Sequence, residues 1–96
     1  MAYGYVVGFV TIDNPEEYKE YAARDPSIVA AFGGEYLARG GDFDVVEGNF
    51  PGRLAVIIRF PTYDAAKNWY DSAEYAEIRP IRQAVASASI MIIEGV

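Results

Sequence analysis

The sequence contains no cysteine and no histidine among its 96 residues. Without cysteine, the chain has no disulfide, no thiolate nucleophile and no cysteine-ligated metal site. Without histidine, it lacks the commonest general base, the commonest zinc ligand and the usual proximal ligand of haem. We therefore expect no metal and no cofactor, and a glutamate or tyrosine would have to carry out any proton transfer.

Positive charge is also scarce: 8 lysines and arginines stand against 14 acidic residues, giving a net charge of −6 and an isoelectric point near 4.4. This balance disfavours binding to nucleic acids and to anionic membranes. No apolar run approaches the roughly 18–20 residues of a membrane helix, and the N-terminus lacks the basic segment of a signal peptide. We expect a cytoplasmic protein without nucleic-acid or membrane partners.

Apolar residues, by contrast, make up 52 % of the chain, and only 23 % of it is charged. That composition is typical of an ordered globular protein, and the length predicts a single domain over residues 1–96. A chain this short has little interior, so its apolar surplus indicates burial against a second copy.

Three stretches alternate as β-strands do, yet they are apolar on both faces: residues 3–12, 53–60 and 89–94. A strand with one face in water normally shows polar residues on that face. Each of these strands therefore needs a cover on both sides. Residues 35–39 and 43–48 predict a fourth strand that is interrupted by a glycine-rich bend or bulge.

The first helix is predicted between a cap and a glycine stop. Asn14 is a good N-cap, and Pro15 then occupies the first helical position, where proline is favoured. Gly33 is the expected left-handed residue after the C-terminus. Within this span, Asp25 and Pro26 resemble a second cap and first position, which predicts a kink or two short helices.

A second helical segment begins after the N-cap Thr62 and extends to about Ala86. Asp71 offers another start signal, because Glu74 follows three residues later as in a capping box. Pro80 predicts a further break. The order of elements is then strand, helix, strand, strand, helix, strand.

That order predicts an α+β, ferredoxin-like fold, in which a four-stranded antiparallel sheet carries both helices on one face. The other face would form a large exposed apolar patch. We expect the same face of a second copy to cover it, burying on the order of 800 Å² per partner. This predicts a homodimer with its sheets face to face. The alternative is a monomer whose long loops fold over the open face.

A series of short motifs runs through the chain in the following order: Asp13-Asn14-Pro15, Tyr18, Tyr21, Phe32-Gly33-Gly34, Leu37 to Gly41, Val46-Glu47-Gly48, Phe60-Pro61, Ala65, Trp69-Tyr70, Ser72 to Tyr75, Arg79 to Arg82 and Glu94-Gly95. In this order and spacing they resemble, over essentially the whole length, the bacterial family called domain of unknown function 1330. The resemblance implies a ferredoxin-like fold and the dimeric α+β barrel superfamily. Members often have proline where Ala73 stands, so the helix start there is expected to be softer.

The family has no settled activity, so the resemblance implies no catalytic residues. Its superfamily relatives include cofactor-free monooxygenases, haem-degrading enzymes, dye-decolourising peroxidases, muconolactone isomerases and stress-responsive binding proteins. Such breadth shows that this fold does not fix a function, so the candidate residues have to be weighed one by one.

Arg39 and Arg59 are the first candidates, because each lies among apolar neighbours on strands expected to be adjacent. An unpaired buried charge is very costly. The two arginines could hold the carboxylate or enolate of a small ligand. They could equally pair within the chain, with Glu35, Asp44 or Glu47.

Arg79 and Arg82 stand three residues apart and could share one helix face as an anion clamp. The simpler interpretation is a pair of surface arginines tied to Glu74 or Glu77. Trp69 and Tyr75 follow at helical spacing and either surround a substrate or pack against the sheet.

Tyr5 points, with Tyr3, to the face between the two sheets, where its hydroxyl could bind a ligand or the partner. Glu47 and Glu94 lie near strand ends and are candidate bases or ordinary solvated residues.

Three functions remain open. The chain could bind a small aromatic or anionic metabolite between or beneath its sheets, in a closed apolar pocket with a few polar anchors. It could be a cofactor-independent monooxygenase or isomerase, in which a tyrosine or glutamate moves the proton and an arginine stabilises the enolate. Or it could be an accessory dimerisation module without a ligand.

Overall fold

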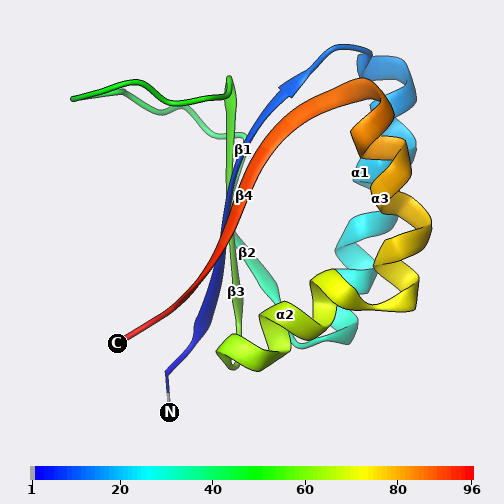
Figure 1. The fold of residues 1–96 in the computed structure, drawn as a ribbon, viewed down its shortest axis with the longest axis vertical. Helices are drawn as coiled ribbons and strands as arrows, with labels where there is room; N and C mark the ends of the chain where they lie inside the picture. The colour runs from blue at the N-terminus through cyan, green and yellow to red at the C-terminus, as the bar shows by residue number, and fades with distance from the viewer. Residues whose placement is uncertain (1) are drawn as a thin grey trace.

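The computed structural model describes residues 2–96, which form one four-stranded antiparallel sheet with helices on one face only (Figure 1). The elements are β1 (Gly4–Ile12), α1 (Pro15–Ala31), β2 (Glu35–Arg39), β3 (Leu54–Phe60), α2 (Tyr63–Asp71), α3 (Ala73–Val85) and β4 (Ala86–Glu94). The strand order is β2-β3-β1-β4. This confirms the predicted ferredoxin-like α+β fold.

β1 is central and pairs antiparallel with both β3 and β4, so that Val6 stands between Ile58 and Ile92. Its alternate residues Gly4, Val6, Gly8 and Val10 are buried and face the helices. The core lies between that face and the helices, where its largest fully buried side chains come from every layer: Val29, Phe60, Trp69, Tyr75 and Ile78. The other face of the sheet, called the open face below, carries no helix (Figure 1).

Both ends of α1 follow the sequence prediction. The Asn14 side chain accepts a hydrogen bond from the Glu17 backbone N–H at 3.3 Å. At the other end Gly33 is left-handed with φ 80°, and the Gly34 N–H donates to the Val29 carbonyl at 2.9 Å. This is a Schellman closure, which satisfies carbonyls that the helix end would otherwise leave unpaired.

The predicted division of α1 at Pro26 is wrong, because a single helix runs through it. Proline has no N–H to donate to the carbonyl four residues earlier, which is that of Ala22. The guanidinium of Arg39 supplies the missing donor, with Nη2 2.8 Å from the Ala22 oxygen. Asp25 is accordingly an interior helical residue and not an N-cap.

The second helical segment does divide, but one residue later than predicted. Thr62 caps α2 as expected, whereas the cap of α3 is Ser72, whose Oγ accepts from the Tyr75 N–H at 3.1 Å. α3 then continues unbroken through Pro80. β4 begins at Ala86 rather than at residue 89, because its small residues pair with the end of β1. In each case tertiary packing overrides the local signal.

The predicted strand over residues 43–48 does not form. Residues 41–51, which we call the arm, are all exposed and have no regular structure. In Figure 1 the arm (green) extends away from the sheet on the side opposite the helices. β2 is an edge strand whose pairing with β3 ends at Arg39, so no neighbouring strand remains to extend the sheet.

Candidate functional site

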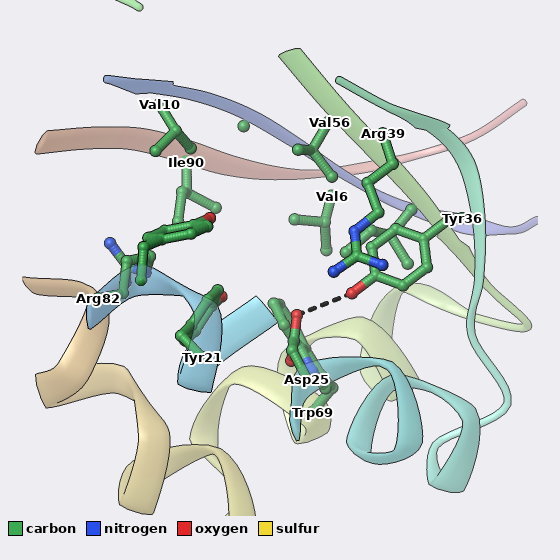
Figure 2. Close-up of a pocket in the computed structure, with 13 residues that line it drawn as sticks. Val6, Val10, Tyr21, Asp25, Tyr36, Arg39, Val56, Trp69, Arg82 and Ile90 are labelled. Carbon is green, nitrogen blue, oxygen red and sulfur yellow. Dashed lines mark hydrogen bonds between the residues drawn. The ribbon is translucent and has the colours of Figure 1, made fainter. Parts of the chain in front are cut away.

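A pocket lies between the helix-facing side of the sheet and α1, which packs mainly along α3 (Figures 1 and 2). Its empty space, including the open mouth, is about 490 Å³. Most of its wall is aliphatic or aromatic. The lining residues are Val6, Gly8, Val10, Tyr18, Tyr21, Asp25, Tyr36, Arg39, Val56, Ile58, Trp69, Arg82 and Ile90.

A β-bulge in β2 brings two polar side chains to this pocket. Tyr36 pairs with Ile58 and Arg39 with Val56, with a shift in register between residues 36 and 38. Without the bulge, two residues three apart would point to opposite faces of the sheet. With it, both face the helices, and the Arg39 guanidinium lies 4.7 Å from the centre of the Tyr36 ring.

Asp25 projects from α1 into the same space and is only 4 % exposed. Its Oδ2 accepts a hydrogen bond from the Tyr36 hydroxyl at 2.9 Å, while Oδ1 has no partner. Burial raises the pKa of this carboxyl, and the Tyr36 hydroxyl and the nearby Trp69 indole partly offset the increase. The Trp69 Nε1 does not reach full hydrogen-bond geometry. Asp25 is thus a buried carboxyl with unused bonding capacity.

Arg82 comes from α3 and is only 5 % exposed. Its Nε has no hydrogen-bond partner, and among residues 2–96 the ion pairs all involve other cations. The Tyr21 ring centre lies 5.9 Å from the guanidinium carbon. Burial lowers the pKa of Arg82, but the neighbouring tyrosines, Tyr75 first, outweigh it and leave the pKa above its ordinary value. A charge this buried normally has a carboxylate partner, and here none comes from the described part of the chain.

The tyrosine hydroxyls around the pocket are neutral donors. Tyr21 and Tyr75 share a buried hydrogen bond, with their oxygens 2.7 Å apart. Burial, followed by the negative charge of Asp25, raises the pKa of Tyr21 and of Tyr36 above the ordinary value. These phenols therefore stay protonated at neutral pH. Tyr36 donates its hydrogen bond to Asp25, and the Tyr21–Tyr75 pair retains one O–H that can donate a hydrogen bond to an anion.

Figure 2 shows the polar groups gathered at two ends of the pocket. Arg82 lies at one end, while Asp25, Tyr36 and Arg39 lie at the other. Aliphatic side chains from the sheet form the wall between them. Two guanidinium groups against one carboxyl make the site cationic, so the arrangement suits a small planar or aromatic anion.

Three of the seven predicted site residues line this pocket: Arg39, Trp69 and Arg82. The prediction that Arg82 lies on the surface is wrong, because its position on the buried stripe of α3, four residues after Ile78, turns it inward. Trp69 is a core residue, 2 % exposed, that also forms part of the pocket wall.

The structure separates Arg59 from Arg39. Arg59 pairs with Glu35 across the two strands and stacks on the Tyr3 ring at 4.5 Å. Its strand neighbours in the same row face away from the helices, so Arg59 lies with Tyr5 on the open face. The alternative in which both arginines hold one ligand is therefore wrong, because the bulge turns Arg39 to the helix side, whereas the pairing of Arg59 with Glu35 is one of those expected within the chain.

The remaining two candidates lie behind the pocket wall. Tyr75 is fully buried in the core, where its hydroxyl contacts that of Tyr21 and lies near Arg82. Arg79 donates to the Tyr70 carbonyl at 3.2 Å and lies over the Tyr70 ring. Within residues 2–96 no cluster of three or more acidic side chains could hold a metal ion, and no described helix is both long and apolar enough to cross a membrane.

Sequence reasoning missed Tyr18, Tyr21, Asp25 and Tyr36 as pocket residues. The signal for Asp25 was present: it falls on the apolar stripe of α1, seven residues after Tyr18. An acidic residue on a buried stripe needs a buried partner or a ligand. Nothing in the sequence located the bulge that exposes Tyr36 to the same pocket.

The fold and this pocket define a ferredoxin-like α+β protein with a cationic cavity between sheet and helices. The chain belongs to the family described as domain of unknown function (DUF1330), which it matches over residues 3–96. No curated protein matches it significantly.

Several solved structures share the fold at low sequence identity. A protein of unknown function from Rhodopseudomonas palustris has a TM-score of 0.78 at 15 % identity, with 99 % of this chain and 83 % of that chain covered. SnoaB, a cofactor-independent oxygenase from Streptomyces nogalater, has a TM-score of 0.66 at 12 % identity, covering 97 % and 92 %. A dimeric ferredoxin-like protein of unknown function from Thermobifida fusca has a TM-score of 0.61 at 15 % identity, covering 96 % and 92 %.

Proposed function

We propose that this protein binds a small organic anion with a planar or aromatic body in the pocket between its sheet and α1. The observation that carries the proposal is Arg82, a cation that is 5 % exposed and forms no ion pair within the described chain. A ligand carboxylate at that end of the pocket would supply the missing counter-charge and accept charge-assisted hydrogen bonds.

The rest of the pocket fits the body of such a ligand. The enclosed part of the pocket is only about 50 Å³, smaller than a typical small-molecule site, so the body of a ligand would extend into the open mouth. The walls are the aliphatic row of the sheet on one side and the aromatic rings of Tyr18, Tyr21 and Trp69 on the other. At the far end, the Arg39 guanidinium beside Tyr36 is placed to donate to a second oxygen, such as a keto or phenolic group, while the Tyr36 hydroxyl holds Asp25.

The test is a thermal-shift and calorimetric screen of small aromatic and keto acids, each compared with its uncharged primary amide. Acids that bind should raise the melting temperature by roughly 10–20 °C at a hundredfold excess over Kd, because such an excess adds about 2.7 kcal/mol. The amides should have little effect. Equal responses to acid and amide would contradict the proposal.

Two arginine variants give the control. Arg82→Met should fold and lose the response to acids, because the counter-charge is gone. Arg53→Met removes the same charge from an exposed position outside the pocket and should respond as the wild type does. If Arg82→Met still binds the acids, Arg82 is not the anion site.

A second candidate function is cofactor-independent proton-transfer chemistry, and Asp25 is the observation that favours it. Its raised pKa makes the carboxylate a better base than an exposed aspartate. It could take a proton from a bound acid and leave an enolate or phenolate beside Arg39. Returning the proton to another carbon would isomerise the ligand, and adding dioxygen would oxygenate it. SnoaB, which shares the fold, is a cofactor-independent oxygenase.

This second function predicts deuterium exchange into an acid that binds, or oxygen consumption in its presence. Proton NMR in heavy water and an oxygen electrode measure the two directly. Asp25→Asn should abolish either activity and leave binding of the acid intact. If an acid binds but shows neither deuterium exchange nor oxygen uptake, the protein binds the acid without transforming it.

We also propose that the protein is a homodimer joined through the open faces of its sheets. Side chains there are apolar and substantially exposed, among them Tyr3, Met91 and Ile93. The related fold from Thermobifida fusca is described as dimeric. Light scattering should give twice 10.6 kDa, and a mass of 10.6 kDa at micromolar concentration would refute the dimer. A dimer that responds to no acid would support an accessory dimerisation module instead.

A further inference from the structure

We propose that the arm, residues 41–51, of each copy lies across the open face of a second copy, so that the two protomers exchange arms. This inference rests on the homodimer proposed above and is independent of the ligand. The arm is long, has no regular structure of its own and extends away from the molecule that carries it (Figure 1).

The composition of the arm is wrong for a segment that stays in water. Within eight residues it exposes four large apolar side chains, and Val46 is 93 % exposed. These residues are Phe43, Val45, Val46 and Phe50. Solvent-facing connections are usually built from small and polar residues, and an apolar group of this density marks an interaction surface.

The base of the arm is held firmly, so its direction is set by the sheet. On one side the Gly40 N–H donates to the Ala55 carbonyl at 2.9 Å, and on the other the Arg53 N–H donates to Val10 at 3.0 Å. Gly52 is required there, because a Cβ at that position would lie 2.6 Å from the Val10 nitrogen. The arm therefore leaves the sheet at a fixed place.

The arm is continuous with the open face, and this indicates that a second copy of the chain covers both. Phe50 packs on Phe9 of the open face, with ring centres 5.2 Å apart. From that contact the rest of the arm extends beyond the sheet, on the side opposite the helices (Figure 1). Apart from the contact of Phe50 with Phe9, the arm thus leaves its own open face uncovered. A second copy placed on the open face would meet the arm directly.

The area is sufficient for a stable dimer. The arm and open face together expose seven large apolar side chains at 41–93 %: Tyr3, Phe43, Val45, Val46, Phe50, Met91 and Ile93. With the half-buried residues between them, the available surface is on the order of 800 Å² per partner, the size of a standard specific interface. Two-fold symmetry makes the exchange reciprocal. The acidic residues Asp42, Asp44 and Glu47 disfavour an anionic membrane as the occupant.

The first test measures dimer dissociation by light scattering across a dilution series. Phe43→Ser combined with Val46→Ser should weaken the dimer by at least about 100-fold, because both side chains lose their burial. Ala23→Ser combined with Ala30→Ser introduces two serines on the exposed side of α1, outside the arm, and should leave dissociation unchanged. An arm variant that dimerises as tightly as the wild type overturns the inference.

The second test needs no substitution. Hydrogen exchange of residues 41–51 should be fast in dilute, monomeric protein and slowed at least tenfold in concentrated protein, where the partner covers the arm. A dimer whose arm exchanges at the unprotected rate overturns arm exchange but preserves the sheet-to-sheet dimer. A protein that stays at 10.6 kDa at every concentration overturns both.

Discussion

Replacing Arg82 by methionine should make the protein more stable while it abolishes binding of the proposed anion. Methionine has a similar length and fills the same space without a charge. The substitution removes a guanidinium that is 5 % exposed and whose Nε is unpartnered. If Arg82 serves a ligand, the unliganded protein tolerates this charge at a cost, and the cost should be measurable.

The magnitude follows from the surroundings of Arg82. Exchanging buried charges for well-packed apolar groups is often neutral to stabilising, by up to about 4 kcal/mol. Against this stands the loss of the contact with the Tyr21 ring at 5.9 Å, worth about 2 kcal/mol at a desolvated site. A net gain of up to roughly 2 kcal/mol remains, which corresponds to a rise of up to roughly 16 °C in Tm for a domain of this size.

Urea unfolding and calorimetry of the ligand-free variants would measure this gain. Arg53→Met should change the free energy of unfolding by less than about 0.5 kcal/mol, because Arg53 is exposed. A fall in Tm for Arg82→Met would refute the reasoning. It would show that the guanidinium is satisfied inside the unliganded protein and that Arg82 is a structural residue.

Three further predictions concern the interior. Burial raises the folded-state pKa of Asp25, so the folded chain holds this proton more tightly and stability falls as pH rises from about 4. Asp25→Asn should remove that fall. Urea titrations should therefore find the variant more stable than the wild type at pH 7 but not at pH 4. Tyr21→Phe and Tyr75→Phe should each lower the free energy of unfolding by about 1–3 kcal/mol, because each leaves the other hydroxyl without its partner. In a double-mutant cycle the double variant should lose less than the sum of the two single losses. Strict additivity would disprove the coupling. Gly4→Ala would drive its Cβ into the Thr62 backbone and should lower Tm by at least 10 °C in differential scanning calorimetry, and a Tm close to that of the wild type would contradict this packing.

Local sequence signals predicted most of the fold. The strands around residues 3–12 and 53–60 and the caps at Asn14, Thr62 and Gly33 form as expected, because alternation and capping depend on neighbours in the chain. The failures involve long-range contacts. Pro26 does not divide α1, since an arginine from another strand satisfies the freed carbonyl. A rule based on neighbouring residues in the sequence cannot identify that partner.

The pocket was predicted less well than the fold for the same reason. Arg39 and Trp69 were candidate residues, but Arg39 was paired with Arg59 across a sheet whose register the bulge changes. Asp25 was mistaken for a cap because its local sequence fits one. Its position on the apolar stripe of α1, like that of Arg82 on α3, was the better guide.

The position of α1 has a consequence for how this family can diversify. α1 rests mainly on α3, and its backbone stands off the sheet, so Tyr21 and Val29 reach the core beside the sheet through their side chains. Substitutions at Tyr18 or Asp25, which lie outside that core cluster, can therefore reshape the cavity while the strand pairing and the helix pair persist. Chains with this architecture can acquire new ligand preferences through a few replacements along one helix, without rebuilding the scaffold that carries them.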